Sequence, residues 1–477
     1  MPPQAMSENT MLLKPTLHVE VAVKRQPSSL LEVKTLRADL KQWFVDRHVT
    51  VKIGQDIIVD GDEQCLAIVD HVGVADYTGP LNLLGYYGTE SVQIDLQTYV
   101  LRSETDTDGR RSIAQETDGG VPQARVLALP SVALKDEWDS LVFDDLLPSR
   151  LLRYMTRMVG MMRQPGLSLA AFNWNRLCLL HGPPGSGKST LCRALAQKLS
   201  IRLGDAFPRA TLIEINTNAM LSKYFGESGK LIGATFERIY AAAQDQGTLI
   251  CVVMDEVETI AGSRERSTEG GECGDGLRAT NQLLTALDRL RHLSNVIVLC
   301  TSNLIGAIDQ AFLDRVDIKQ LIPSPSPAAI YNIFRSCLNE LLRSSLVSTT
   351  TVQVTARKTV TRGVSKDPRR TKIQAVSSSP EPWAVISAPE VPTFSEVQIE
   401  LMDKPQSAGY RVWALAQRCE GFSGRTLRRL PILGLAMYTW GGESVTLDNA
   451  ISALEAAVNQ ELTVAKAKGA DTDMHDG

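Results

Sequence analysis

The sequence predicts an α/β fold: a core with a parallel sheet and helices on both faces, a small α+β domain before it and a helical domain after it. Short apolar runs alternate with helical patterns from residue 134 onward, which is typical of parallel strands joined by crossover helices. The apolar runs are candidate strands, at 177–180, 212–215, 249–254 and 296–300. Polar motifs follow three of them at the carboxyl end, where ligands bind in such sheets.

Composition and charge exclude several classes of protein. The chain has 477 residues, of which 43% are hydrophobic and 22% charged, so wholesale disorder is excluded. A formal net charge of −4 and an aromatic share of 5% argue against direct nucleic-acid binding. No apolar run approaches the ~18 residues that a membrane-spanning helix needs, so we expect no membrane partner. The eight cysteines contain no Cys-x-x-Cys pair, which favours reduced thiols in a nuclear or cytosolic protein over a zinc site or disulfides.

Changes in composition and hydrophobic spacing along the chain predict its domain organisation. Loose alternation, helical spacing and short apolar runs before residue 100 indicate the α+β domain, and helical texture from residue 413 indicates the helical domain. The helical domain is interrupted by a stretch rich in Ser, Thr, Pro and basic residues, which predicts a largely disordered insertion. The expected segments are a flexible tail at 1–15, the N-terminal domain at 16–102, a linker at 103–132, the core at 133–325, the helical domain at 326–468 with the insertion at 344–406, and a flexible tail at 469–477.

The most specific motif is a phosphate-binding loop, G-x-x-x-x-G-K-S, from Gly182 to Ser189. It lies between an apolar run and a helical stretch, the strand–loop–helix context that the motif requires. Its glycines let backbone N–H groups turn toward phosphate oxygens, and the following helix adds partial positive charge. Lys188 is expected to contact the β- and γ-phosphates and Ser189 to hold Mg²⁺, so the expected cofactors are ATP and Mg²⁺. The alternative, a glycine-rich turn that binds nothing, is disfavoured by the complete pattern.

The apolar run at 249–254 ends in two carboxylates, Asp255 and Glu256. A buried parallel strand is continuously apolar, and ligands bind at its carboxyl end. Asp255 is therefore expected to hold Mg²⁺ through water, and Glu256 to orient or polarise the attacking water. Solvated acids at a strand end are the common alternative, but the lysine loop 67 positions before Asp255 favours nucleoside triphosphate hydrolysis. The expected nucleotide-binding residues are Gly182, Pro183, Pro184, Gly185, Ser186, Gly187, Lys188, Ser189, Thr190 and Asp255, with Ser189 and Asp255 at the metal.

Two further polar residues follow the next buried strand. Asn303 is expected to hydrogen-bond the γ-phosphate or the attacking water, although an Asn after a strand is usually a turn residue. Arg315 is the candidate arginine finger, a guanidinium supplied to the nucleotide of a neighbouring subunit. The alternative for Arg315 is a surface salt bridge with Asp314 or Asp317.

A late helix carries another candidate, Arg425. Ser423 is the expected N-cap, which puts Arg425 in the first turn, where the helix dipole disfavours a cation unless an anion lies nearby. This position favours a role facing phosphate. The alternative is an exposed arginine in a basic helix with Arg428 and Arg429. The expected catalytic residues are Glu256, Lys188, Asn303, Arg315 and Arg425.

Taken together, these residues resemble the AAA+ ATPases. Segments 138–142, 191–199, 314–320 and 423–431 narrow the resemblance to the pachytene checkpoint protein 2 family. The resemblance implies a P-loop AAA+ core, a C-terminal helical lid and a homo-hexameric ring. It also implies remodelling of HORMA-domain proteins in meiotic chromosome-axis control and spindle-checkpoint silencing, with an N-terminal domain that engages the substrate or its adaptor. The implied location is the nucleus, at chromosomes, and also the cytoplasm.

An aromatic–apolar–glycine pattern, Lys223, Tyr224, Phe225 and Gly226, fits a pore loop. An aromatic side chain that projects into a narrow channel grips a peptide by packing, without sequence specificity. The alternative is an ordinary helix start with buried aromatic side chains. The family often carries Trp where this chain has Tyr224. The glycine-rich stretch 264–277 fits a second pore loop or plain disorder.

The expected function is ATP-driven pulling of a substrate segment through a central pore. One alternative is a remodeller of other protein substrates, such as tubulin tails or misfolded chains. A single ATPase unit and the lack of an extended microtubule-binding segment argue against it. Another is a nucleotide-switched, axis-binding scaffold without turnover, against which the intact Glu256 argues. The basic part of the insertion, 357–372, is expected to be a solvated loop rather than a DNA contact or a nuclear signal.

Overall fold

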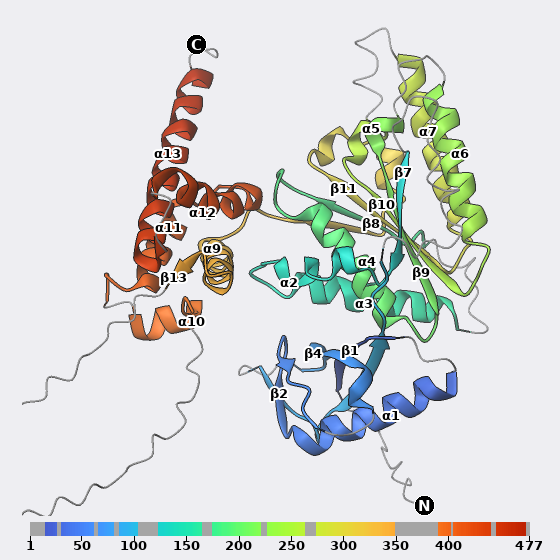
Figure 1. Cartoon of the computed structure of the whole chain (residues 1–477). Coiled ribbons are helices and arrows are strands. Elements are labelled where there is room, and N and C mark those ends of the chain that lie inside the picture. Colours follow the sequence, from blue (N-terminus) through green and yellow to red (C-terminus); the bar gives the residue numbers. More distant parts are fainter. Residues whose placement is uncertain are drawn as a thin grey trace, which may run out of the picture. The chain divides into compact units, whose positions relative to one another are not determined.

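The chain divides into two units, Met1–Pro323 and Ser324–Gly477 (Figure 1). The first unit holds the N-terminal domain and the nucleotide-binding core, and the second holds the helical domain. The computed structural model describes residues 15–25, 30–61, 65–80, 85–103, 123–164, 174–220, 227–262, 273–348, 390–401, 404–439 and 445–473.

A six-stranded sheet is the centre of the nucleotide-binding core, in the order β12-β8-β11-β10-β9-β7. Its strands pair in parallel except for β7, which pairs antiparallel with β9 at one edge. β10 and β11 are buried along their whole lengths, which explains their unbroken apolar sequences. The bounds are β7 Ala124–Leu129, β8 Leu177–His181, β9 Arg209–Ile215, β10 Thr248–Met254, β11 Val296–Ser302 and β12 Ile318–Leu321.

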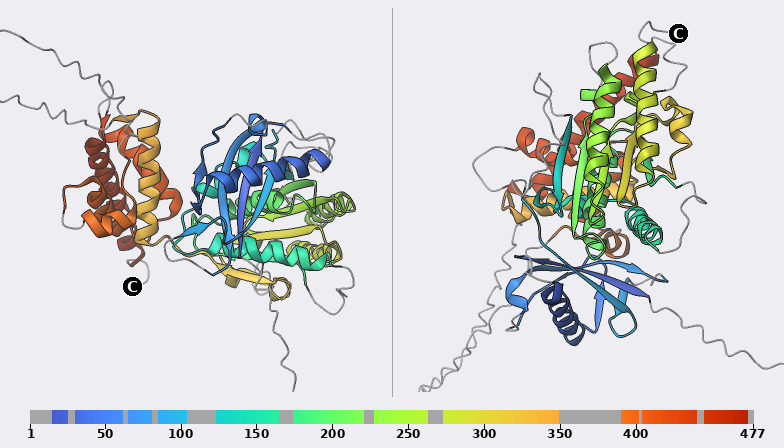
Figure 2. Two further views of the ribbon diagram at one scale, coloured as in Figure 1. Left: turned by 90° about the horizontal axis from the view of Figure 1, so that it is seen from below. Right: turned by 90° about the vertical axis from the view of Figure 1, so that its right-hand side faces the viewer.

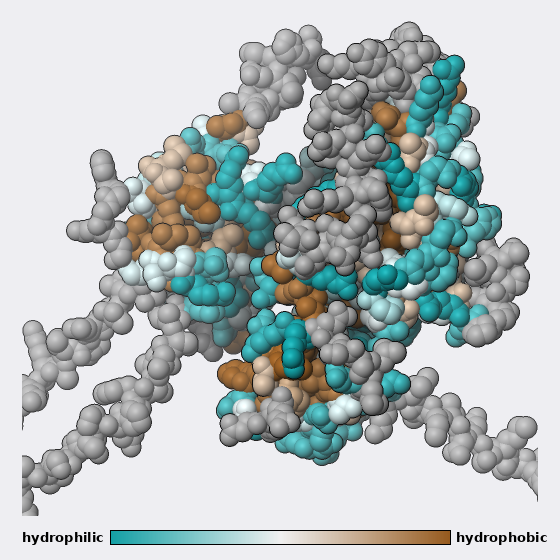
Figure 3. Space-filling view, turned by 45° about the vertical axis from the view of Figure 1, so that its right-hand side comes forward, coloured by the Kyte–Doolittle hydropathy of each residue, from teal (hydrophilic) through white to brown (hydrophobic). Residues whose placement is uncertain are grey.

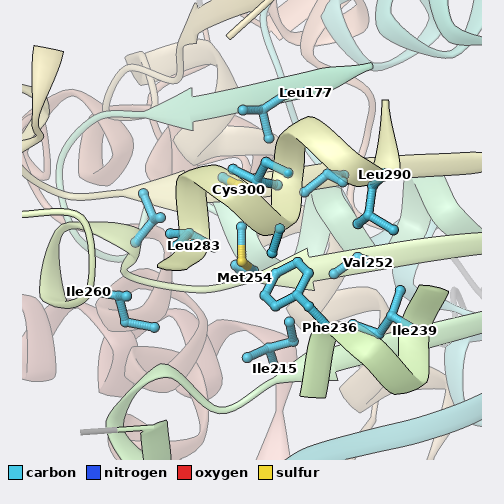
Figure 4. Close-up of a cluster of buried hydrophobic side chains, with 14 of the residues drawn as sticks. Leu177, Ile215, Phe236, Ile239, Val252, Met254, Ile260, Leu283, Leu290 and Cys300 are labelled. Carbon is cyan, nitrogen blue, oxygen red and sulfur yellow. The ribbon is translucent and has the colours of Figure 1, made fainter. Parts of the chain in front are cut away.

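Helices cover both faces of this sheet, as Figure 2 shows. On one face, α3 and α4 pack over a cluster that includes Leu195 and Leu199. On the other face, α6 and α7 pack over a cluster that includes Phe236 and Leu283 (Figure 4). Much of the surface of the nucleotide-binding core that Figure 3 shows is hydrophilic. The bounds are α2 Glu137–Ser140, α3 Leu147–Met162, α4 Lys188–Arg202, α5 Thr217–Met220, α6 Glu227–Ala242, α7 Cys273–Leu290 and α8 Gln310–Leu313. The predicted α/β core with helices on both faces is confirmed.

The N-terminal domain is a four-stranded sheet, β3-β4-β1-β6, with α1 packed on one face. Alternation along β1 sends Leu17, Val19 and Val21 into the core that contains Leu40 and Phe44 of α1. The intervening side chains of β1 point to the opposite face. The bounds are β1 Thr16–Val23, α1 Leu30–Arg47, β3 Asp56–Ile57, β4 Val69–Thr78 and β6 Gln93–Tyr99, beside a small pair, β2 Thr50–Lys52 and β5 Tyr86–Gly88.

Helices α9, α11, α12 and α13 make up most of the described part of the second unit. Ser423 accepts a hydrogen bond from the Thr426 amide at the start of α12, so the predicted N-cap is confirmed. The rings of Tyr331, Phe394 and Trp413 pack against one another between α9, α10 and α11. The bounds are α9 Pro327–Arg343, β13 Val347–Ser348, α10 Phe394–Glu396, a π-helix Val397–Leu401, α11 Ala408–Arg418, α12 Gly424–Tyr438, β14 Val445–Thr446 and α13 Leu447–Asp473.

The structure differs from the predicted segment boundaries at several points. Residues 347–348, predicted as the start of the disordered insertion, form β13 and pair with β14. Residues 124–129, predicted as linker, form β7 because they pair with β9 at the sheet edge. Residues 390–401, predicted as part of the disordered insertion, pack on α9, where the Val391 amide donates to Asn339. Helix α13 continues to Asp473, into the predicted tail.

Several predicted segments lie outside the described residues. They are the N-terminal tail before residue 15, the linker at 104–122, the insertion at 349–389 and the end of the chain at 474–477. None of the described helices combines the length and the apolar character that crossing a membrane requires. Seven cysteines, at positions 65, 178, 192, 251, 300, 337 and 419, are free thiols. Burial raises the pKa of Cys251, in the middle of β10, to about 12.

Candidate nucleotide-hydrolysis site

The phosphate-binding loop joins β8 to α4 through glycines with positive φ. These are Gly182 at +145°, Gly185 at +74° and Gly187 at +95°, conformations that side chains with a Cβ rarely adopt. A Cβ on Gly182 would also lie 2.1 Å from the Ile322 carbonyl oxygen, so no larger residue fits there. The loop therefore leads directly into the N-terminus of α4, whose free amides and dipole favour an anion.

Lys188, the first residue of α4, is buried against this loop. Its ammonium donates hydrogen bonds to the carbonyl oxygens of Gly182 at 2.9 Å and Pro183 at 2.7 Å. Burial lowers the pKa of Lys188, and the nearby carboxylates of Asp255 and Glu258 act in the opposite direction. The ammonium is thus held at the inner side of the loop, where it can exchange carbonyl oxygens for phosphate oxygens.

Asp255, just after β10, connects three elements of the site. One of its oxygens, Oδ1, accepts hydrogen bonds from Ser189 Oγ of α4 at 2.7 Å and from Thr301 Oγ1 of β11. Thr301 Oγ1 in turn accepts a hydrogen bond of 3.2 Å from the Glu256 amide. Thr301 is absent from the predicted site. Its only signal in the sequence is a hydroxyl two positions before Asn303 at the carboxyl end of a buried strand.

Glu256 has a left-handed backbone conformation, with φ +52°. Such strain in a residue other than glycine is rare and concentrates at functional positions. The side-chain nitrogen of Asn303, Nδ2, lies 3.5 Å from Glu256 Oε1, at the limit of a hydrogen bond. The backbone N–H of Asn303 donates a hydrogen bond of 2.9 Å to Glu258 Oε1. Glu258, like Thr301, is absent from the predicted site. The structure therefore brings Lys188, Ser189, Asp255, Glu256 and Asn303 into one cluster.

Arg315 forms its hydrogen bonds elsewhere in the fold. Its Nε and Nη2 donate to the two carboxylate oxygens of Asp288 on α7, each at 2.9 Å, and Nη1 donates to the Ala311 carbonyl at 2.7 Å. The alternative prediction, a salt bridge of Arg315 with Asp314 or Asp317, is wrong in its partner. The ion pair forms with Asp288, because α7 brings that carboxylate within reach. Asp288 and the hydrogen bond to it raise the pKa of Arg315, so the guanidinium stays charged.

The remaining predicted residues belong to the second unit or fall outside the described residues. Arg425 is exposed in the first turn of α12, in the second unit. The candidate pore loop, Lys223, Tyr224, Phe225 and Gly226, lies outside the described residues, in the segment between α5 and α6.

Thr301→Val is expected to lower kcat for ATP hydrolysis while changing the Kd for ATP little. The substitution keeps the shape of the side chain but removes one hydrogen bond to Asp255 and one from the Glu256 amide. A hydrogen bond to a charged group is worth ~1.5–3 kcal/mol, which corresponds to a loss of about tenfold to a hundredfold. Steady-state phosphate release and nucleotide titration measure the two quantities. Thr285→Val is the matched control, because the exposed Thr285 hydroxyl donates to the Asn281 carbonyl of the same helix, α7. Equal kcat in both variants would contradict the role of Thr301.

Models of known families match most of the chain. The ATPase family associated with various cellular activities (AAA) matches residues 178–324, and the TRIP13 N-terminal domain matches residues 12–104. The TRIP13-like, AAA+ ATPase lid C-terminal domain matches residues 326–462. Together with the phosphate-binding loop and the Asp255 cluster, these matches define an ATP-hydrolysing enzyme of the AAA+ class.

Relatives named pachytene checkpoint protein 2 homolog are similar to this chain over most of its length. The Danio rerio protein is 32% identical over 456 residues, 94% of this chain and 95% of that protein. The Xenopus tropicalis protein is 35% identical over 445 residues, 93% of each chain. A solved structure of C. elegans PCH-2 is 25% identical with a TM-score of 0.66, covering 94% of this chain and 99% of that chain. The chain belongs to the pachytene checkpoint protein 2 family.

Proposed function

We propose that the protein forms a hexameric ring that uses ATP hydrolysis to remodel HORMA-domain proteins of meiotic chromosome axes and the spindle checkpoint. The ATP-driven part rests on one observation, the cluster in which Ser189 is hydrogen-bonded to Asp255 and Asn303 contacts Glu256. Lys188 lies beside these residues, where the carbonyl oxygens of the phosphate-binding loop hold its ammonium and the Asp255 carboxylate acts on its pKa. Membership of the pachytene checkpoint protein 2 family supports a HORMA-domain client. The proposed location is the nucleus, at chromosomes, and the cytoplasm.

Ser189 and Asp255 fit a Mg²⁺ ion that accompanies ATP. A hydroxyl and a carboxylate oxygen, 2.7 Å apart, are the hard donors that this ion prefers. When bound, the ion neutralises charge on the phosphate oxygens. Lys188 then binds the β- and γ-phosphates, Glu256 orients the attacking water and takes up its proton, and Asn303 holds the Glu256 carboxylate in place.

Assembly into a ring completes the site. Arg315 of one subunit reaches the γ-phosphate bound by its neighbour and neutralises the charge that develops there. Arg425 contacts phosphate from the lid, which couples lid movement to the nucleotide. Hydrolysis moves the pore loop and pulls on one segment of the client, and partial unfolding of that segment is enough to convert a protein between two packings.

Tyr224→Ala is expected to abolish client conversion while ATP hydrolysis stays within about twofold of the wild type. The pore-loop ring grips the client by packing and has no part in the chemistry. Conversion of a HORMA-domain protein and phosphate release are measured on the same preparation. Tyr438→Ala, at an exposed tyrosine of α12, is the matched control. Unaltered conversion by the Tyr224 variant would remove the grip from the mechanism.

The direct test of the function mixes the purified full chain with ATP and a HORMA-domain protein in its closed conformer. Conversion or release of that protein, dependent on hydrolysable ATP, is the expected result. ATP hydrolysis without any effect on HORMA-domain proteins would favour a remodeller of other substrates. Binding to the HORMA-domain protein without phosphate release would favour a nucleotide-switched scaffold.

A further inference from the structure

The N-terminal domain contacts the phosphate-binding helix α4 through charged side chains that are buried or half-buried. Glu20 lies on the face of β1 opposite the domain core, and its Oε2 accepts a hydrogen bond of 2.6 Å from Lys198 Nζ of α4. These side chains are 7% and 16% exposed. The other oxygen of Glu20 is buried and has no hydrogen-bond partner among the described residues. Compensation of the Glu20 charge therefore depends strongly on Lys198.

A second acid of the N-terminal domain repeats this arrangement one turn further along α4. Asp76 of β4 and Arg202 of α4 are each 4% exposed, and Asp76 Oδ2 lies 3.3 Å from Arg202 Nη1. The same carboxylate oxygen lies 3.5 Å from Arg153 Nε of α3. One buried aspartate is thus held by arginines from two helices of the nucleotide-binding core.

Buried ion pairs of this kind favour one arrangement of the two charged groups over others. Removing one partner leaves an uncompensated charge in a poorly solvated place, which is far more destabilising than losing an exposed pair. Arg37 and Asp205 form another ion pair near the end of α4, but Asp205 is exposed and water screens it. The buried pairs, with Lys198 and Arg202, are therefore the contacts that set how the N-terminal domain sits on α4.

Helix α4 carries the nucleotide-binding residues at its other end. It begins at Lys188 and Ser189 and has 15 residues, so it spans about 22 Å. Along its length Leu195 is fully buried in the core cluster, so the helix is anchored to the sheet. One anchored helix thus carries predicted nucleotide-binding residues at its start and contacts the N-terminal domain at its end.

We propose that Glu20, Asp76, Lys198 and Arg202 form an electrostatic joint that fixes the N-terminal domain to the phosphate-binding helix. Through this joint, a client held by the N-terminal domain acts on the nucleotide site of the same subunit. The joint itself follows from the contacts above, whereas its effect on a client rests on the proposed function.

The joint is tested first without any client, by exchanging the charges of one pair. In calorimetry of the full chain, the N-terminal domain and the nucleotide-binding core are expected to unfold in one transition. Glu20→Lys and Lys198→Glu are each expected to separate an early transition of the N-terminal domain, and the double exchange is expected to restore a single one. Glu20→Gln is a milder variant for the case that charge reversal prevents folding. Glu237→Gln, which breaks an exposed ion pair with Arg289, is the control and should leave the transition unchanged.

The second measurement is ATP hydrolysis with and without a closed HORMA-domain protein. Basal hydrolysis is expected to stay within about twofold in every variant, because none of these residues touches the nucleotide. Stimulation by the HORMA-domain protein is expected to fall by about fivefold or more in each single variant and to return in the double exchange.

The outcomes separate the joint from the proposed function. If the wild type itself unfolds in two transitions, or if the double exchange is as impaired as the sum of the single variants, the joint is overturned. If a HORMA-domain protein never stimulates the wild type, the proposed function fails, and the unfolding data still decide whether the joint exists. Normal stimulation in Glu20→Lys would overturn the role of the joint in coupling.

Discussion

Glu256→Gln is expected to retain ATP binding and to lose turnover, with kcat lower by ~10²–10⁴-fold, because glutamine cannot take up the proton of the attacking water. The side chains are nearly isosteric, so the distance to Asn303 and the left-handed backbone at Glu256 should persist. Steady-state phosphate release measures the loss, and titration with a fluorescent ATP analogue measures the retained affinity.

The matched control for this substitution is Glu237→Gln on α6, where the carboxylate is exposed and pairs with Arg289. It should hydrolyse ATP like the wild type. Normal turnover in Glu256→Gln would refute the assignment of the general base. Loss of ATP binding would instead indicate that the Glu256 charge holds the loop around Lys188 together, a result that the hydrogen bonds of Lys188 to loop carbonyls do not lead us to expect.

The parts of the site that local sequence predicts are those whose roles depend on neighbours along the chain. The run from Gly182 to Ser189 needs only a strand before it and a helix after it, and both are present. The placement of Asp255 and Glu256 follows from a strand that is apolar along its length. Such motifs carry their structural context with them.

Other features of the fold were not predictable because they depend on contacts between distant elements. Thr301 matters through Asp255, which is 46 positions away on the neighbouring strand. Arg315 has acids close by in the sequence, yet the fold pairs it with Asp288, 27 positions away on α7. Residues 124–129 are predicted as linker but form β7, because an edge strand is defined by its pairing rather than by its composition.

The candidate arginine finger makes a prediction that depends on assembly. Arg315→Ala is expected to lower kcat by about 10³-fold or more while ATP binding is retained, because the guanidinium stabilises charge only during transfer of the phosphoryl group. Arg315→Lys should not restore activity. A guanidinium donates two parallel hydrogen bonds, as Arg315 does to the two oxygens of Asp288, and an ammonium cannot reproduce that geometry. Arg289→Ala, at the exposed arginine that follows Asp288 on α7, is the matched control.

A mixing experiment distinguishes a finger that acts on a neighbour from one that acts within its own chain. Subunits with Glu256→Gln keep Arg315, and subunits with Arg315→Ala keep Glu256. In a mixed ring, one type of interface combines both intact residues, so mixtures should hydrolyse ATP faster than either variant alone. If Arg315 acts within its own chain, every site in the mixture lacks one residue and no activity returns. Since Asp288 holds the guanidinium by both carboxylate oxygens in the single chain, recovery in the mixture would also mean that assembly draws Arg315 away from Asp288.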